Sequence, residues 1–293
     1  MISGVGLDGK SFFYTNAMQV KNINDDKHIE AARSGWFECS CCPTNVARLI
    51  PSVPGYIYAQ QGDRLFVNLF IAGTAGVTIN KKKVSIIQEN NYPWDGALSI
   101  AVSPASPTAF TLLVRIPGWS QNTAIPSSLY QFTGNSTATA TIKINGQPYT
   151  YNTENGYAVI RRNWKKGDKV EVTLPMETRM VTANENVRDD IGKVALQRGP
   201  LVYCAEWKDN EGQTSRFILP EGTTFRTEYD ANLLNGVMTL KTELPVVMVE
   251  NNTVSTVKKP FTAIPYFSWA NRGKGEMNVW FPQRVKDVEL LSR

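Results

Sequence analysis

The sequence predicts a mainly β protein with two sandwich-like domains, which follow a short segment of mixed character. From Arg64 onward, short apolar runs alternate with turn residues, and this rhythm is typical of antiparallel sandwiches. Asn145-Gly146 and Asn155-Gly156 each stand between two apolar runs, where Asn-Gly favours a tight hairpin turn. We therefore expect antiparallel strands over most of the chain.

Residues 1–58 differ from the rest, because they combine a short strand with a helix. The strand is expected over 11–15. Four apolar residues then follow the i, i+3, i+4, i+7 spacing of a helical face: Val46, Leu49, Ile50 and Val53. Pro43 suits the first position of this helix, whereas Pro51 and Pro54 are expected to kink and end it. The single apolar side of the helix has no obvious partner in the remaining sequence.

The two β domains are expected at 59–180 and 181–293. Strands of the first are predicted at 64–71, 76–79, 84–87, 98–102, 110–116, 139–144, 157–160 and 169–174. Strands of the second are predicted at 193–196, 201–206, 238–240, 244–249, 261–269 and 277–281. No linker rich in Gly, Ser or Pro separates the domains near residue 180, so we expect them to pack on one another.

The composition excludes several classes of protein. Of the 293 residues, 42% are hydrophobic and 19% are charged, which argues against a disordered or collagen-like chain. The net charge of +5 is dispersed, so no nucleic-acid partner is expected. No apolar run reaches the ~18 residues of a membrane span, and the first residues lack the features of a secretory signal.

Three of the four cysteines, Cys39, Cys41 and Cys42, are clustered just where the predicted helix begins. The helix dipole and the free N–H groups there favour thiolates, which bind Zn²⁺ and attack electrophiles. Adjacent cysteines cannot complete a tetrahedral zinc site, and His28, the single histidine, or Cys204 would supply only part of the remainder. Cys204 itself lies in an apolar run and is expected to be a buried, inert thiol. The spacing alone leaves a functional thiol, a metal site and a merely buried or disulfide-bonded cluster open.

The cysteine cluster and its flanking residues resemble the cysteine motif of glycoside hydrolase family 127 and its relative, family 146, which are β-L-arabinofuranosidases. The motif reads WFECSCCPTNVAR over 36–48. Further segments resemble the same family in the same order along the chain, at 7–16, 115–119, 144–146, 164–168, 194–203 and 263–273.

This resemblance implies a retaining glycosidase with a cysteine nucleophile. By motif position, Cys41 would be the nucleophile, and Cys41 and Cys42 would both bind Zn²⁺, which holds a thiol deprotonated. Cys39 would lie nearby without being a required ligand. Tyr14 would line the sugar pocket, and a glutamate would act as general acid and then as base.

The resemblance also implies that residues 1–58 are the C-terminal end of an (α/α)₆-barrel catalytic domain. The acid/base glutamate and two further zinc ligands, a glutamate and a cysteine, have no counterpart in this sequence. We therefore expect a truncated C-terminal part that neither binds zinc tightly nor hydrolyses arabinofuranosides by itself. Two alternatives are a non-catalytic carbohydrate-binding or interaction module built on the sandwiches, and a purely structural zinc or redox cysteine cluster.

The partner expected from the resemblance is an arabinose-containing oligosaccharide or glycan. A homodimer is kept as an option. For the compartment of the parent protein, the bacterial periplasm and the cytoplasm both stay open.

Overall fold

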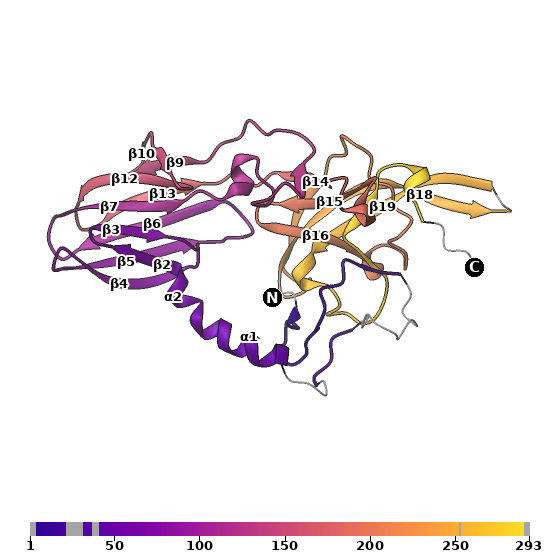
Figure 1. Ribbon diagram of the computed structural model, residues 1–293, viewed down its shortest axis with the longest axis horizontal. Helices are drawn as coiled ribbons and strands as arrows, with labels where there is room; N and C mark the ends of the chain where they lie inside the picture. Colours follow the sequence, from indigo (N-terminus) through magenta and orange to yellow (C-terminus); the bar gives the residue numbers. More distant parts are fainter. Residues whose placement is uncertain (1–3, 22–31, 37–40, 252, 290–293) are drawn as a thin grey trace. The chain divides into compact units, whose positions relative to one another are not determined.

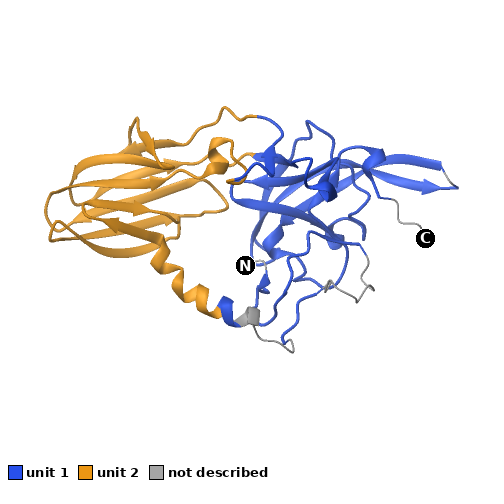
Figure 2. Ribbon diagram, in the orientation of Figure 1, with its two compact units in different colours: residues 1–46, 127–134, 178–293 blue, residues 47–126, 135–177 orange. Residues whose placement is uncertain are grey.

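The computed structural model describes residues 4–21, 32–36, 41–251 and 253–289 (Figure 1). The chain divides into two compact units, which Figure 2 distinguishes by colour: unit 1 comprises 1–46, 127–134 and 178–293, and unit 2 comprises 47–126 and 135–177. Strands make up 47% of the structure and helices 11%, so the mainly β prediction is confirmed.

Unit 2 is a sandwich of two sheets. The first sheet has the order β10 (Gln147–Pro148), β9 (Thr141–Ile144), β13 (Asp168–Thr173), β6 (Ala97–Pro104), β5 (Lys82–Asn90) and β4 (Gly73–Ile79). The second has the order β11 (Asn152–Glu154), β12 (Tyr157–Trp164), β7 (Thr108–Arg115), β3 (Arg64–Val67) and β2 (Tyr58–Gln61). All neighbours are antiparallel except β3 and β7. Both sheets contribute side chains to one buried core, which includes Ile86, Ile100, Leu112 and Trp164.

Both predicted Asn-Gly turns close hairpins of this sandwich. The φ angles are 52° and 78° at Asn145 and Gly146, and 50° and 82° at Asn155 and Gly156. Two consecutive positive φ angles define the tight hairpin turn that matches the twist of the flanking strands. The first turn joins β9 to β10 and the second joins β11 to β12.

A buried carboxylate braces the first of these turns. Asp168, at the start of β13, is only 7% exposed. It accepts hydrogen bonds from Asn145 Nδ2 at 2.8 Å, from the Lys165 amide at 2.8 Å and from Arg162 Nε at 3.3 Å. Burial by itself raises the pKa of Asp168, but the hydrogen bonds from Asn145, Lys165 and Arg162 and the Arg162 charge together lower it below the usual value.

We expect Asp168→Asn to lower the free energy of unfolding at pH 7 by about 1–3 kcal/mol, since an amide brings donors that this site cannot satisfy. The folded-state pKa lies below the unfolded one, so the stabilisation is complete above about pH 4 and is lost as the pH falls through the folded value. Urea unfolding should therefore show that the difference in free energy of unfolding between the parent chain and Asp168→Asn is smaller at pH 3 than at pH 7. Glu171→Gln, at a half-exposed position on the same strand, is the control. An equal difference in free energy of unfolding at both pH values would contradict the prediction.

Unit 1 is built on a ten-stranded sheet. Its main path is β17 (Arg226–Asp230), β18 (Val237–Glu250), β19 (Thr253–Pro265), β16 (Leu201–Glu206), β15 (Lys193–Arg198), β14 (Thr178–Ala183) and β8 (Tyr130–Phe132). Three short strands lie off this path: β1 (Gln19–Val20), β20 (Met277–Asn278) and β21 (Trp280–Pro282).

The sheet of unit 1 forks between β15 and β16. Residues 196–198 of β15 pair with 201–203 of β16, but residues 193–195 pair with β21 instead. On the other strand of the hairpin, residues 205–206 at the end of β16 pair with β20 and not with β15. The segment 277–282 therefore inserts where the hairpin opens, and the strands predicted for the second sandwich-like domain belong to one forked sheet.

The two units divide the chain differently from the predicted ranges 1–58, 59–180 and 181–293. Residues 127–134 lie in unit 1, because β8 pairs there with β14. Residues 1–46 also lie in unit 1, because β1 pairs with β20. Both pairings join residues far apart in the sequence, so local patterns carry no signal of them.

The predicted helix is present as α1 (Cys41–Ser52), followed by α2 (Pro54–Ile57). Pro51 does not end it but lies inside its last turn, where its missing N–H removes a single hydrogen bond. On the predicted apolar side, Ile50 is 58% exposed. The strand expected over 11–15 is reduced to isolated bridges from Phe12 to Val5 and Ser34.

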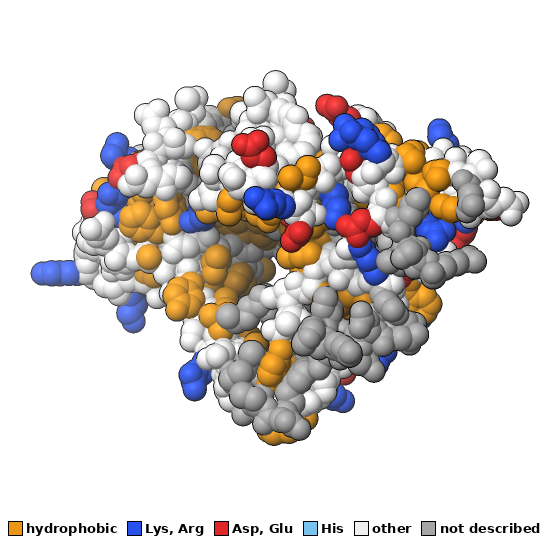
Figure 3. Space-filling view, turned by 45° about the vertical axis from the view of Figure 1, so that its right-hand side comes forward, with side chains coloured by type: hydrophobic (Ala, Val, Ile, Leu, Met, Phe, Trp, Pro, Cys, Tyr) orange, Lys and Arg blue, Asp and Glu red, His pale blue; other side chains and the backbone are white. Residues whose placement is uncertain are grey.

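Short 3₁₀ helices also occur among the described residues: η2 (Gly118–Gln121), η3 (Arg188–Asp190), η4 (Trp207–Asp209), η5 (Tyr266–Ser268) and η6 (Val285–Asp287). In the described part of the chain, no helix has the length and apolar character needed to cross a membrane. On the face shown in Figure 3, acidic and basic side chains are scattered among polar and apolar ones, in line with the dispersed charge of the sequence.

Candidate functional site

The predicted site residues all lie in the N-terminal segment of unit 1. Cys41 and Cys42 form the start of α1, as the sequence predicts, although their side chains lie outside the described part of the structure. The unpaired N–H groups and positive dipole end of such a turn favour a thiolate. Tyr14 is half-buried. Cys39 and His28 lie outside the described residues.

A backbone ladder joins this N-terminal segment to the sheet of unit 1. In the β1–β20 pair, Gln19 lies opposite Asn278 and Val20 opposite Met277. The Val279 amide donates to the Met18 carbonyl at 3.0 Å, and the Tyr266 hydroxyl donates to the Ala17 carbonyl at 2.8 Å. The segment is thus an additional edge strand of the C-terminal sheet.

An aromatic contact lies at the centre of this junction. The rings of Phe13 and Trp269 stack with centroids 4.7 Å apart and planes 6° apart. The Arg33 guanidinium lies 4.7 Å from the Phe13 ring centroid and donates through Nη1 to the Trp269 carbonyl. Burial lowers the pKa of Arg33, and the charge of Glu206 partly opposes that shift. Both Phe13 and Trp269 are buried, so the contact is desolvated.

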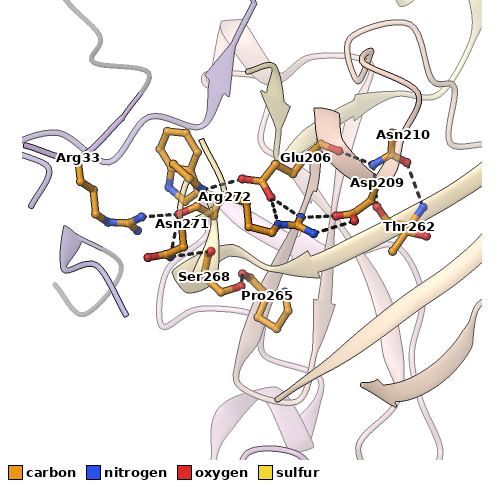
Figure 4. Close-up of polar contacts among 11 residues, drawn as sticks. Arg33, Glu206, Asp209, Asn210, Thr262, Pro265, Ser268, Asn271 and Arg272 are labelled. Atoms are coloured by element: carbon orange, nitrogen blue, oxygen red, sulfur yellow. Dashed lines mark hydrogen bonds and ion pairs between the residues drawn. The ribbon is translucent and has the colours of Figure 1, made fainter. Parts of the chain in front are cut away.

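Trp269 belongs to the 266–272 loop, which a hydrogen-bond network holds in shape (Figure 4). Glu206 Oε1 accepts from the amide of Ala270 at 2.7 Å, and Ala270 has a φ of 55°. Asn271 Nδ2 donates to the Ser268 carbonyl at 2.8 Å. Asn271 Oδ1 accepts from the Leu7 amide at 2.9 Å, which adds another tie to the N-terminal segment.

A buried ion cluster lies beneath the loop. Arg272 donates through Nε to Glu206 at 2.9 Å and through Nη1 to Asp209 at 2.8 Å, and its Nη2 contacts both carboxylates. The side chains of Glu206 and Arg272 are 2% and 13% exposed. Burial by itself lowers the pKa of Arg272, but the hydrogen bonds and charges of Asp209 and Glu206 raise it above its ordinary value. Arg272 is therefore a permanent cation that compensates two carboxylates.

The fourth cysteine does not take part in this chemistry. Cys204 lies in β16, is fully buried and forms no disulfide. Burial, together with the nearby charge of Glu206, raises the pKa of its thiol well above the ordinary value. The prediction that Cys204 is a buried thiol is confirmed.

Unit 2 contains a cavity of about 420 Å³ near the end of β7. Its lining includes Asn68, Phe70, Tyr92, Arg115 and Trp119, and it contains no Asp, Glu, His or Cys. The lining of this cavity therefore contains no carboxylate that could act as a general acid or base. Outside this cavity, Trp164 and Trp269 are buried in the cores.

Sequence reasoning missed the Arg33, Glu206 and Arg272 contacts. The only signals were a glutamate ending the apolar run 201–206 and an arginine following Trp269, neither of which identifies its partner. Within the described ranges, no group of three or more His, Cys, Asp or Glu residues is placed to hold a metal ion.

Comparisons with known proteins agree with one another. Three family models match consecutive parts of the chain: the GH127 β-L-arabinofuranosidase catalytic domain over 1–55, the GH127 middle domain over 64–176, and the glycoside hydrolase family 127 C-terminal domain over 178–282. A non-reducing end β-L-arabinofuranosidase of Bifidobacterium longum subsp. longum is 35% identical over 95% of this chain and 43% of its own length.

Two solved structures are similar in fold as well as in sequence. One is a GH127 β-arabinofuranosidase, with a TM-score of 0.92 and 39% identity over 98% of this chain and 44% of its own length. The other is a GH127 β-L-arabinofuranosidase from Geobacillus stearothermophilus T6, with a TM-score of 0.85 and 39% identity over 97% of this chain and 44% of its own length. The chain thus spans less than half the length of these relatives.

Proposed function

We propose, because this chain belongs to glycoside hydrolase family 127, that it is the part of a β-L-arabinofuranosidase that carries the nucleophile. The observation that carries this proposal is the position of Cys41 at the start of α1, within the 1–55 segment that matches the GH127 catalytic domain. The proposed substrate is an arabinose-containing oligosaccharide or glycan, the class named by the related β-L-arabinofuranosidases.

In the proposed reaction, the Cys41 thiolate attacks the anomeric carbon of the arabinofuranosyl residue. The C–S bond forms as the glycosidic C–O bond breaks, and a general acid protonates the departing oxygen. Water, deprotonated by the same group, then cleaves the C–S bond and restores the thiolate with overall retention. Tyr14 is proposed to line the sugar pocket in both steps.

Zinc is the proposed cofactor. The donor set suits it in part, because Cys41 and Cys42 bring two thiols to a helix start that favours thiolates, whereas a structural zinc site needs four ligands. Bound zinc would hold the Cys41 sulfur deprotonated near neutral pH. The remaining ligands and the general acid are proposed to come from residues that this chain does not supply, as the sequence motifs indicate.

We expect the purified 293-residue chain to contain zinc well below one equivalent and to release no aglycone from an aryl β-L-arabinofuranoside. The physical reason is that two thiols cannot complete a tetrahedral site and no general acid is available. Metal analysis by mass spectrometry and a chromogenic assay check this result. One equivalent of zinc or measurable turnover by the isolated chain would contradict it.

The function itself is tested in a longer polypeptide, in which this chain replaces the matching region of the Bifidobacterium longum relative. We expect that chimera to hydrolyse the aryl β-L-arabinofuranoside with retention of anomeric configuration, observed by proton NMR of the first product. A folded chimera that binds zinc but has no activity would overturn the assignment.

A further inference from the structure

The N-terminal segment and the 266–272 loop meet through contacts of several independent kinds. These are the Phe13–Trp269 stack, the Arg33 bond to the Trp269 carbonyl, the Leu7 bond to Asn271, and the bond from the Tyr266 hydroxyl to the Ala17 carbonyl. The loop belongs to the C-terminal part of the chain, whereas the segment matches the catalytic-domain model. We propose that this loop positions Tyr14 and the start of α1 for catalysis, with Trp269 and Arg33 as the positioning residues.

The link from the loop to Tyr14 is short. Tyr14 follows Phe13 directly, so any displacement of the Phe13 ring from Trp269 is passed to Tyr14 through a single peptide unit. The backbone around this point is also tied together. The Phe13 amide donates to the Gly4 carbonyl at 2.7 Å, and Phe12 and Ser34 exchange amide–carbonyl bonds of 2.8 and 2.9 Å. Backbone hydrogen bonds therefore join the chain near residues 4, 12, 13 and 34.

The link from the loop to Cys41 passes through Arg33. Its guanidinium contacts both members of the stack, the ring of Phe13 and the carbonyl of Trp269. Arg33 precedes Cys41 by eight residues, which span at most about 26–29 Å, so holding Arg33 bounds the position at which α1 can begin. Trp269 of the 266–272 loop is thus connected to Tyr14 through Phe13 and to the start of α1 through Arg33.

The loop is suited to this role because it also has hydrogen bonds to its own sheet and within itself, which do not involve the segment. Glu206 binds the Ala270 amide and the Arg272 guanidinium at once, and Glu206 itself lies at the end of β16. Ser268 and Asn271 close the loop with bonds to the Pro265 and Ser268 carbonyls. A loop held by its own sheet can fix the position of the segment that packs on it, and misplacement of a reacting group by about 1 Å costs on the order of 10²-fold in rate.

The inference rests on the proposed function, but it is tested on this chain without any assay of activity. In Trp269→Leu, we expect the amides of Phe12 and Phe13 to exchange with deuterium at least about tenfold faster, because their segment separates locally from the sheet. The NMR signals of the Tyr14 ring should move towards those of an unfolded tyrosine. Arg33→Met, a milder change at a half-buried site, should have the same effects in weaker form, and Trp269→Phe should restore most of the protection.

Phe217→Leu is the matched control, because Phe217 is a buried aromatic residue of unit 1 in a separate core cluster. It should lower the stability of unit 1 and leave the Tyr14 signals unchanged. Unchanged exchange in Trp269→Leu and Arg33→Met, or equal effects of Phe217→Leu on Tyr14, would overturn the inference. If Trp269→Leu fails to fold, the amide exchange and the Tyr14 signals of Arg33→Met decide whether the inference holds. Absence of hydrolysis by the chimera would overturn the proposed function and leave these measurements valid.

Discussion

Cys41→Ala in the active chimera is expected to reduce kcat for β-L-arabinofuranosides by at least about 10³-fold, because no other group of the proposed site can form the covalent intermediate. The remaining protein would still bind the sugar, so KM should change far less than kcat. The measurement is steady-state hydrolysis of the aryl glycoside, with zinc content determined in parallel.

Cys39→Ala is the matched control, since the family resemblance gives that neighbouring cysteine no required role as a ligand. It should retain most of the activity. Cys41→Ser is a sharper variant, because its hydroxyl keeps the size of the side chain but is not a thiolate at neutral pH. Activity of Cys41→Ala within tenfold of the parent would remove Cys41 from the mechanism.

Arg272→Met is expected to lower the free energy of unfolding of unit 1 by about 3–5 kcal/mol, because it leaves the buried Glu206 carboxylate and the partly buried Asp209 carboxylate without their cation. Removing one member of a buried ion cluster destabilises the fold strongly, because an unpaired charge stays buried. Replacing the whole cluster by apolar residues of similar size costs much less stability. Urea unfolding followed by tryptophan fluorescence measures this change.

Two further variants test the physical reason. Arg284→Met removes an arginine that is 61% exposed and paired with Asp287, and it should change the stability by less than about 1 kcal/mol. Glu206→Gln combined with Arg272→Met should recover part of the loss, since a neutral amide is less costly to bury than an unpaired carboxylate. A loss below 1 kcal/mol in Arg272→Met itself would show that water reaches the cluster.

The sandwich of unit 2 was predictable from the sequence, and the reason is local. Alternation of buried and exposed residues within a strand, as in β6, leaves a pattern that can be read one strand at a time. The Asn145-Gly146 and Asn155-Gly156 turns are equally local, because their backbone angles suit those two residue types. The helix start at Cys41 belongs to the same class, although the helix continues past Pro51.

The forked sheet of unit 1 was not predictable in this way. The insertion of 277–282 between β15 and β16, and the transfer of β8 to the sheet of the C-terminal part, depend on which distant strands pair. The pattern of a strand predicts that its edge will pair with another strand, but it does not identify that partner strand. The candidate site shows the same division, because the motif identified Cys41 and Cys42, whereas nothing in it pointed to Trp269.

The sequence by itself indicated most strands of unit 2, the two Asn-Gly turns, the family and the residues proposed for the chemistry, since each of these depends on neighbouring residues. Only the tertiary structure decided that Phe13 stacks on Trp269 and that Arg272 neutralises Glu206 and Asp209. These contacts join groups that are far apart in the chain and become favourable only after folding removes them from water and brings them within a few ångströms. No local pattern records that proximity.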